Sequence, residues 1–278
     1  MNPLMTDDGL ALQGHDWASE HPRGRVLIVH GLGEHMDRYA PLAAALNSDG
    51  WQVQGWDLRG HGGSAGKRGD TPDPEAMLRD IARMLDAMRP GPGPRVLLGH
   101  SMGGVLAARF VAESLQARPA AWSRPVDALV LSSPALDANL SGAQRAALAL
   151  AERLAPGLAV NNGLKTGWIS RDPAVVRAYE DDPLVHDRIT ARLTRTILEA
   201  GRIALEAAPR WVTPTLLMWA GADRCVAPRG SQAFAAAAPD GVLSHRVWPE
   251  LYHEIFNEPE RDAVIAELRA WLQTRLTA

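Results

Sequence analysis

The sequence is poor in cysteine and lysine: Cys225 is its only cysteine, and Lys67 and Lys165 are its only lysines. A single cysteine excludes an internal disulfide and a metal centre built from several cysteines. The 29 basic residues are outnumbered by 32 acidic ones, which gives a formal net charge of −3. Without a basic excess, binding to nucleic acid through a charged face is not expected.

Long apolar runs are missing as well. No stretch approaches the roughly 18 apolar residues that a bilayer-spanning helix needs. Residues 1–8 carry neither the basic start nor the apolar core of a secretory signal, so we expect a cytoplasmic protein. Hydrophobic residues nevertheless make up 46% of the 278 residues. That is enough to bury a full core, as one large domain or as a domain with an insertion.

Short apolar runs alternate with segments of helical spacing along much of the chain. Strands are expected at residues 26–29, 51–56, 95–98, 128–134, 215–220 and 242–247, after an opening hairpin strand at 10–17. Helices are expected at residues 39–46, 74–88, 105–111, 231–237 and 259–276. This alternation predicts a parallel sheet with helices on both of its faces.

The pattern changes between residues 137 and 210. No β-branched strand is visible there, and the spacing instead predicts helices at 143–154, 173–179 and 189–207. We interpret residues 137–210 as a helical cap inserted above the sheet. The core domain would then consist of residues 1–136 and 211–278.

The segment from Gly99 to Gly103 places Ser101 between a predicted strand and a predicted helix. A serine on such a sharp turn, with glycine two residues to either side, is typical of a nucleophile elbow. Glycines are needed because side chains there would collide where the strand meets the helix. The alternative is a glycine-rich turn whose serine has no chemical role.

A serine hydroxyl needs a base to remove its proton, and the base needs a carboxylate to orient it. Downstream of Ser101, Asp223 follows a predicted strand end, where open α/β sheets place functional groups. His253 lies between the last predicted strand and the last helix. We therefore predict Asp223 as the acid and His253 as the base. The alternatives are Asp127 or Asp137 as the acid, His186 or His245 as the base, and a helix-capping role for Asp223.

The oxyanion formed when a serine attacks a carbonyl needs hydrogen-bond donors already aimed at it. We expect one donor to be the backbone N–H of Met102, which would lie at the start of the helix after Ser101. We expect the other to be the backbone N–H of Leu32, because residues 30–33 follow the first buried strand as the oxyanion loop of esterases does.

Several of these motifs together resemble one branch of a known family. The segments are 30–35, 38–39, 57–64, 99–104, 220–223 and 252–254. They resemble the monoacylglycerol lipase and lysophospholipase branch of the α/β-hydrolases. The resemblance implies a mostly parallel, twisted sheet of about eight strands flanked by helices, with residues 137–210 as a helical lid. It implies that Ser101, Asp223 and His253 form a triad that uses no metal or cofactor.

The resemblance also implies where a substrate would lie: its acyl chain beneath the lid and its alcohol end deeper, near Glu34 and Arg38. A buried ion pair that holds the loop explains those two residues equally well. Apolar residues crowd the first predicted lid helix, and we expect Leu148 and Leu154 to line the acyl pocket or to make transient contact with a membrane surface. Packing against the sheet is the alternative.

The predicted function is hydrolysis of a medium- or long-chain acyl ester of a small alcohol, monoacylglycerol first, through an acyl-enzyme. A lysophospholipase, a general carboxylesterase and cofactor-free perhydrolysis are alternatives. An S33-type aminopeptidase is another, and it would need a carboxylate cluster such as Glu180, Asp181 and Asp182. The alternative without catalysis is a hydrolase-fold receptor for a small ligand.

Overall fold

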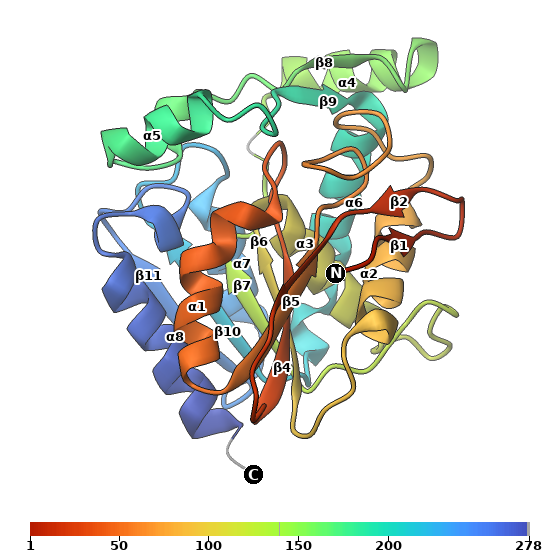
Figure 1. Ribbon diagram of the computed structural model, residues 1–278. Coiled ribbons are helices and arrows are strands. Elements are labelled where there is room, and N and C mark those ends of the chain that lie inside the picture. The colour runs from red at the N-terminus through yellow and green to blue at the C-terminus, as the bar shows by residue number, and fades with distance from the viewer. Residues whose placement is uncertain (139, 277–278) are drawn as a thin grey trace.

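A computed structural model describes residues 1–138 and 140–276 and shows a central sheet of seven strands (Figure 1). In spatial order the strands are β11 (Leu243–Trp248), β10 (Thr215–Ala220), β7 (Ala128–Ser132), β6 (Arg95–His100), β4 (Gly24–Val29), β5 (Trp51–Trp56) and β3 (Gly14–Trp17). All neighbours are parallel except β3, which runs antiparallel to β5. Asn139 and residues 277–278, which belong to the predicted cap and core ranges, lie outside the described residues.

The central sheet has seven strands where the resemblance implied about eight, and the opening segment is divided between two sheets. Residues Ala11–Leu12 (β2) pair with Leu4–Met5 (β1) in a separate two-stranded sheet, and only β3 joins the central sheet. The expected strands and helices of the sheet layers otherwise occur, with small shifts at their ends.

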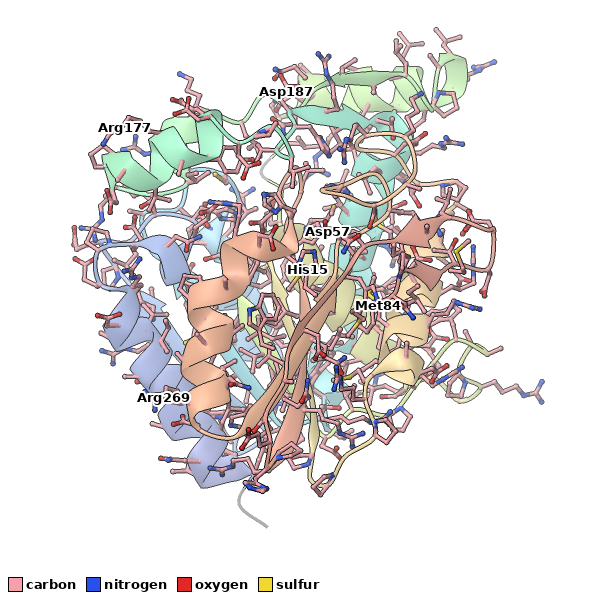
Figure 2. All side chains as sticks on the ribbon, in the orientation of Figure 1. His15, Asp57, Met84, Arg177, Asp187 and Arg269 are labelled. Atoms are coloured by element: carbon pink, nitrogen blue, oxygen red, sulfur yellow. The ribbon has the colours of Figure 1, made fainter. Side chains whose placement is uncertain are left out.

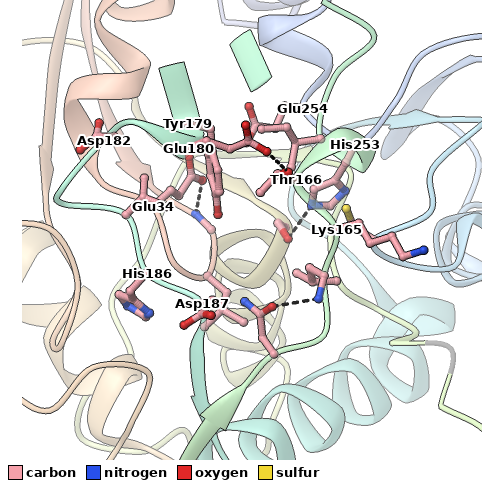
Figure 3. Close-up of a pocket in the computed structure, with 18 of the residues that line it drawn as sticks. Glu34, Lys165, Thr166, Tyr179, Glu180, Asp182, His186, Asp187, His253 and Glu254 are labelled. Atoms are coloured by element: carbon pink, nitrogen blue, oxygen red, sulfur yellow. Dashed lines mark hydrogen bonds between the residues drawn. The ribbon is translucent and has the colours of Figure 1, made fainter. Parts of the chain in front are cut away.

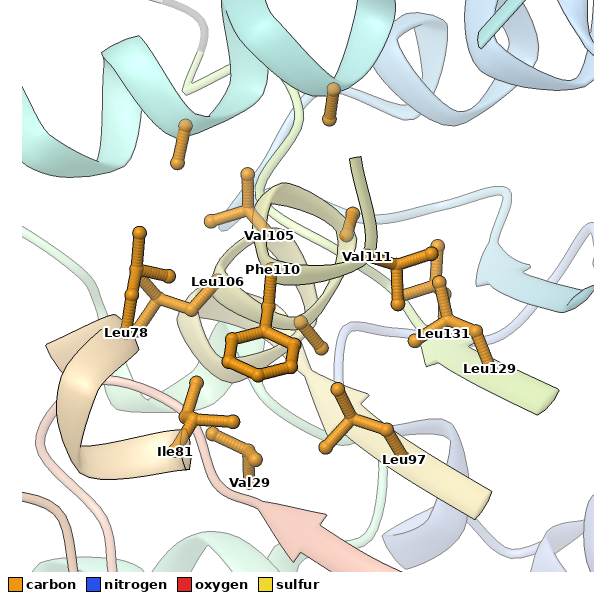
Figure 4. Close-up of a cluster of buried hydrophobic side chains, with 14 of the residues drawn as sticks. Val29, Leu78, Ile81, Leu97, Val105, Leu106, Phe110, Val111, Leu129 and Leu131 are labelled. Carbon is orange, nitrogen blue, oxygen red and sulfur yellow. The ribbon is translucent and has the colours of Figure 1, made fainter. Parts of the chain in front are cut away.

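Helices cover both faces of the central sheet (Figure 1). Helices α1 (Ala40–Ser48) and α8 (Arg261–Arg275) pack on one face, and α2 (Ala76–Ala87), α3 (Ser101–Glu113), α6 (Ala191–Ala207) and α7 (Pro228–Ala237) contribute to the core on the other. Short 3₁₀ helices occur at Met36–Tyr39, Thr166–Trp168, Ala208–Arg210 and Ile255–Asn257. Figure 4 shows how Phe110 of α3 packs between Ile81 of α2 and Leu97 of β6, so the helix that starts at Ser101 is fixed on the sheet by its buried face.

The chain between β7 and β10 contains α4 (Gly142–Leu154), β8 (Ala159–Asn161), α5 (Pro173–Glu180), β9 (Arg188–Thr190) and α6. The antiparallel pair β8–β9 corrects the expectation that this region has no strand. Its strands are three residues long, too short to show an alternating pattern in the sequence. Helix α6 differs from its neighbours, because Leu193 and Ala204 are fully buried in the core beside α3. The division into a core and a cap of residues 137–210 stays a proposal.

Helix α4 lies at the outer edge of the molecule (Figure 1). A capping box between Ser141 and Gln144 defines its start, and no residue of the helix is buried. Leu150 and Leu154 are exposed, the latter to 72%, whereas Leu148 is half-buried. None of the helices in the described part of the chain is long and apolar enough to cross a bilayer.

The carboxyl ends of the parallel strands meet at one edge of the sheet, beneath α5 and β9 (Figure 1). Asp57, which follows β5, organises two loops there by accepting hydrogen bonds from the backbone N–H groups of Met36 and Gly63, each at 2.8 Å. The Nε2 atom of His15, in β3, lies 3.2 Å from the same carboxylate. Figure 2 labels both residues. Arg59 ties the second loop to α2 through Asp80.

Candidate active site

Ser101 occupies the sharp turn between β6 and α3 with a φ of 53°, a left-handed conformation that L-residues rarely adopt. The turn brings backbones so close that only glycine fits beside it. A Cβ at Gly99 would lie 2.4 Å from the carbonyl oxygen of Gly103, and a Cβ at Gly103 would lie 2.1 Å from that of Val29. The geometry has the form of the predicted nucleophile elbow.

His253 and Asp223 reach Ser101 from two other loops. The Nε2 atom of His253 lies 2.8 Å from Ser101 Oγ, and its Nδ1 atom lies 2.7 Å from Asp223 Oδ2. The second oxygen of Asp223 accepts hydrogen bonds from the backbone N–H groups of Cys225 and Val226, which fix its orientation. The side chains of His253 and Asp223 are only 7% and 2% exposed. The three predicted triad members thus form one continuous chain of contacts.

The surroundings tune the basicity of the His253 ring. Burial acts to lower its pKa, but the carboxylates of Asp223, Glu254 and Glu34 together outweigh burial and raise that pKa above its usual range. Beneath it, the ring of His100 lies 4.8 Å from that of His253. Burial and the neighbouring His253 lower the pKa of His100 to about 4, so this second ring is neutral at pH 7. Of the two rings, His253 is the one able to take up a proton.

The predicted oxyanion donors come from two segments, the start of α3 and the loop after β4. Met102 is the second residue of α3, and the N-cap residue His100 makes no side-chain hydrogen bond to this helix end. Leu32 lines the cavity above Ser101. The preceding residue, Gly31, donates its N–H to Glu34 Oε1 at 2.6 Å, which fixes the path of the loop.

Glu34 and Arg38 form a buried ionic network, as the alternative interpretation of these residues required. Arg38 donates to Glu34 Oε2 at 2.8 Å and to both oxygens of Glu254 at 2.6 Å. Burial favours protonation of Glu34, but Arg38 and the other polar neighbours, including the Tyr39 hydroxyl, together lower the pKa of this carboxyl to about 2. Glu254 was missed as a site residue by sequence reasoning, although its position next to His253 was a usable signal.

A cavity of about 560 Å³ opens over Ser101 (Figure 3). Its walls combine apolar side chains with polar ones. Apolar residues in the wall are Leu32, Leu164, Ile169 and Val185, and polar ones include Glu34, Tyr179, Glu180, Asp182 and Glu254. Arg38 is not part of the wall and acts on it through Glu34 and Glu254. Tyr179, on α5, is a cavity residue that the sequence did not single out.

Leu148 and Leu154 do not reach this cavity. Both belong to α4, at the edge of the structure, where Leu148 is half-buried and Leu154 is exposed. The structure therefore corrects the expectation that they line the acyl pocket, because a helix without buried residues cannot deliver side chains to the interior. Their contact with a lipid surface stays a prediction.

The alternative acids and bases have other partners. Asp127 accepts a hydrogen bond from the N–H of Arg95, at the start of β6 and so at the opposite end of the sheet from Ser101. Asp137 pairs with Arg229. His245, in β11, stacks on Trp219 of β10. His186 lines the cavity, and its Nδ1 atom accepts the N–H of Arg188.

Asp223, Cys225 and His253 are the single group of three metal-ligand side chains found close together in the described residues, with ligand atoms within 4.8 Å of one another. Two of these side chains already form a hydrogen bond with each other, between Asp223 Oδ2 and His253 Nδ1. Burial also raises the pKa of the Cys225 thiol, which keeps it in the weakly coordinating protonated form at pH 7. The donor set is thus better suited to proton transfer than to holding a metal.

Comparison with known proteins identifies the family. Residues 20–260 match the family described as serine aminopeptidase, S33. The chain belongs to this family. Among its relatives, the monoacylglycerol lipase of Mycolicibacterium smegmatis is 35% identical, over 92% of this chain and 90% of that protein. The phospholipase YtpA of Bacillus subtilis is 31% identical, over 92% of this chain and 97% of that protein.

A solved structure extends the likeness to three dimensions. The monoacylglycerol lipase of Paleococcus ferrophilus superposes with a TM-score of 0.84 at 32% identity, over 95% of this chain and 99% of that one. This S33 protein therefore has the α/β-hydrolase fold and belongs to the monoacylglycerol lipase and lysophospholipase-like branch. One relative is much longer: the chain spans 29% of an uncharacterized abhydrolase domain-containing protein of Dictyostelium discoideum, at 31% identity.

Proposed function

We propose that this protein is a serine carboxylester hydrolase that cleaves a medium- or long-chain acyl ester of a small alcohol, with monoacylglycerol as the expected substrate. The observation that carries the proposal is the contact chain from Ser101 Oγ to His253 Nε2 and from His253 Nδ1 to Asp223 Oδ2. The proposal also draws on the relatives named monoacylglycerol lipase. No metal or cofactor enters the proposed chemistry.

In the first half of the reaction, His253 Nε2 takes the proton of Ser101 as Ser101 Oγ attacks the ester carbonyl. Asp223 holds the ring with Nδ1 protonated, so that Nε2 presents its lone pair to the hydroxyl. The negative oxygen of the tetrahedral intermediate would accept hydrogen bonds from the backbone N–H groups of Leu32 and Met102. The intermediate collapses when His253 returns its proton to the leaving alcohol, and the acyl group stays on Ser101.

In the second half, water enters the site after the alcohol has left. His253 removes a proton from this water, which attacks the acyl carbonyl through a second tetrahedral intermediate at the same donors. Ser101 then leaves as His253 gives the proton back, and the free fatty acid is released. The overall reaction consumes one water and yields one alcohol and one acid.

The proposal is tested by covalent labelling and a substrate panel. We expect a fluorophosphonate probe to label the protein, and Ser101→Ala to abolish that labelling. The panel contains monoacylglycerols, lysophospholipids, p-nitrophenyl esters and aminoacyl anilides. Turnover of monoacylglycerols is expected, whereas cleavage of the anilides with none of the lipids would overturn the substrate class. Absence of labelling in the wild type would favour a small-ligand receptor.

Lysophospholipid is the second candidate substrate, because the relative from Bacillus subtilis is named a phospholipase. The aminopeptidase alternative requires free carboxylates to receive a substrate amine. Glu180 accepts the hydroxyl of Thr166, and Asp182 lies 2.8 Å from His35 Nε2. Both carboxylates are thus already engaged, which favours the ester substrate. The cytoplasmic location and the contact with a membrane surface stay predictions.

A further inference from the structure

A short segment between α5 and β9, residues 182–186, lies directly on the predicted oxyanion loop, residues 30–35. We call it the clamp segment. The N–H of His186 donates to the carbonyl oxygen of Gly33 at 2.9 Å. Gly33 has a φ of 80°, and a Cβ there would lie 2.3 Å from the carbonyl oxygen of His186. The two backbones are so close that a glycine is required on the loop side.

A second contact joins the same two segments. His35 Nε2 lies 2.8 Å from Asp182 Oδ2, and the His35 side chain is only 4% exposed. The other oxygen of Asp182 accepts the N–H of Leu184 at 2.8 Å, so this carboxylate also shapes the clamp segment itself. Asp182 is therefore a fixed acceptor against which the buried imidazole is held.

Contacts on both sides of Leu32 hold the part of the loop that the proposed chemistry depends on. Leu32, whose N–H is a predicted oxyanion donor, directly precedes Gly33. On the other side of Leu32, Gly31 is held by Glu34. The two residues next to the donor are thus held by Glu34 and by the clamp segment. A shift of about 1 Å in such a donor can cost on the order of 100-fold in rate.

We propose that Asp182 is a positioning residue: acting through His35, it fixes the oxyanion loop, so that the placement of the clamp segment sets the stabilisation of the transition state. The inference rests on the proposed ester hydrolysis. It identifies the clamp segment as the part of the chain above the sheet on which the reaction depends. Asp182 also lines the cavity, so the test must separate an effect on the loop from direct contact with substrate.

The experiment measures kcat and KM for p-nitrophenyl butyrate in the full chain. Asp182→Ala and His35→Leu are each expected to lower kcat by about 10- to 100-fold, with KM changed by no more than about twofold. Asp181→Ala is the matched control, because Asp181 is an exposed neighbour of the same charge. We expect its kinetics to match the wild type. The double variant should be no slower than either single one, because both remove the same contact.

His35→Gln keeps an N–H donor close to the position of His35 Nε2 and should recover most of the lost kcat. Recovery in His35→Gln also distinguishes a positioning role from a folding defect. For the same purpose, Asp182→Ala and His35→Leu should have thermal midpoints within a few degrees of the wild type. A wild-type kcat in Asp182→Ala overturns the inference, and so does a raised KM with unchanged kcat, which would indicate direct substrate contact. If the wild type itself shows neither turnover nor Ser101-dependent labelling, the proposed function fails and takes this inference with it.

Discussion

At the scale of single residues, Asp223 is expected to control which nitrogen of His253 carries the proton. In Asp223→Asn the side-chain amide would either donate a hydrogen bond to His253 Nδ1 or leave the Nδ1–H group without an acceptor. In both cases the ring would no longer be held in the tautomer that presents an unprotonated Nε2 to Ser101. We expect kcat to fall on the order of 10³- to 10⁴-fold while the fold is retained. Steady-state kinetics with a p-nitrophenyl ester, together with the thermal midpoint, measure both properties.

Asp127→Asn is the matched control for that change. Asp127 accepts the N–H of Arg95 at the far end of the sheet, so we expect its loss to affect stability and to leave kcat near that of the wild type. Near-normal turnover in Asp223→Asn, with a large loss in Asp127→Asn or Asp137→Asn, would assign the orienting acid to one of those residues instead.

The protonation of His253 predicts how the rate depends on pH. The ring must be neutral to accept the proton of Ser101, so kcat/KM should fall as pH decreases through the pKa of His253. Burial acts to lower that pKa, but Asp223 raises it above 6.5, with a further contribution from Glu254. We therefore expect the acid limb of the pH–rate profile to have its midpoint above pH 6.5.

Glu254→Gln removes one of the negative charges that raise the pKa of His253, so the acid limb should move to lower pH. Glu250→Gln is the control, because Glu250 lies exposed on the same loop. An acid limb that stays in place in Glu254→Gln, or moves equally in both variants, would contradict this account of the site.

At the scale of elements, the junction between β4 and α3 depends on the absence of a side chain at Gly103. A methyl group there would lie 2.1 Å from the carbonyl oxygen of Val29 and 2.4 Å from that of His30. We expect Gly103→Ala to lower the free energy of unfolding by about 1–3 kcal/mol or more, because backbone atoms must move to admit it. Urea denaturation followed by tryptophan fluorescence measures the change.

Gly142→Ala provides the opposite case within the same protein. Gly142 begins α4, and a Cβ there meets nothing within 4 Å. Alanine should leave the stability unchanged or raise it by up to about 1 kcal/mol, because it restricts the unfolded chain. Equal effects of the two substitutions would show that the close approach at Gly103 does not limit the packing of α3.

The elements that the sequence predicted well are those with a strong local signal. Strands β4 and β6 are continuous apolar runs buried on both faces, and the glycines around Ser101 mark the turn that follows β6. Strands β8 and β9 were missed because each has three residues and is defined by its partner. The role of α6 in the core was also missed. Helical spacing predicts that one face of a helix is buried, but it does not show which element that face packs against.

The same distinction applies to the site. Ser101, Asp223 and His253 could be singled out because each follows a strand end in the expected order, and the structure brings them together. The network of Glu34, Arg38 and Glu254 joins residues more than 200 positions apart, so one sequence could not pair Arg38 with Glu254. Leu154 illustrates the converse error, because an apolar composition does not reveal whether a helix faces the interior or solvent.

At the scale of the whole molecule, several histidines are held neutral inside the fold. Burial lowers the pKa of His100 and of His186 to about 4. It also lowers the pKa values of His30 and His61, which are fully buried. In the unfolded chain these rings would titrate near 6.5. Below that pH the unfolded state therefore binds more protons than the folded state.

This difference predicts acid lability. A group whose folded pKa is depressed loses its stabilising contribution as pH falls from the unfolded towards the folded pKa. For His100 and His186 the window runs from about 6.5 down to about 4. We expect the free energy of unfolding to drop by at least about 2 kcal/mol between pH 7 and pH 4.5. Urea denaturation at several pH values measures this slope.

His15 acts in the opposite sense. Burial acts to lower its pKa, but Asp57 and Asp37 raise it, so its contribution is present below 6.5 and lost as pH rises through the folded pKa. One such group cannot cancel several buried neutral rings. His100→Gln, which removes one of those rings, should reduce the pH dependence of the free energy of unfolding, whereas His15→Gln should increase it. A free energy of unfolding that is constant from pH 7 to pH 4.5, or that rises as pH falls, would contradict this account. It would mean that the buried rings take up protons in the folded protein. A protonated His100 would then repel the positive charge that His253 must acquire during catalysis.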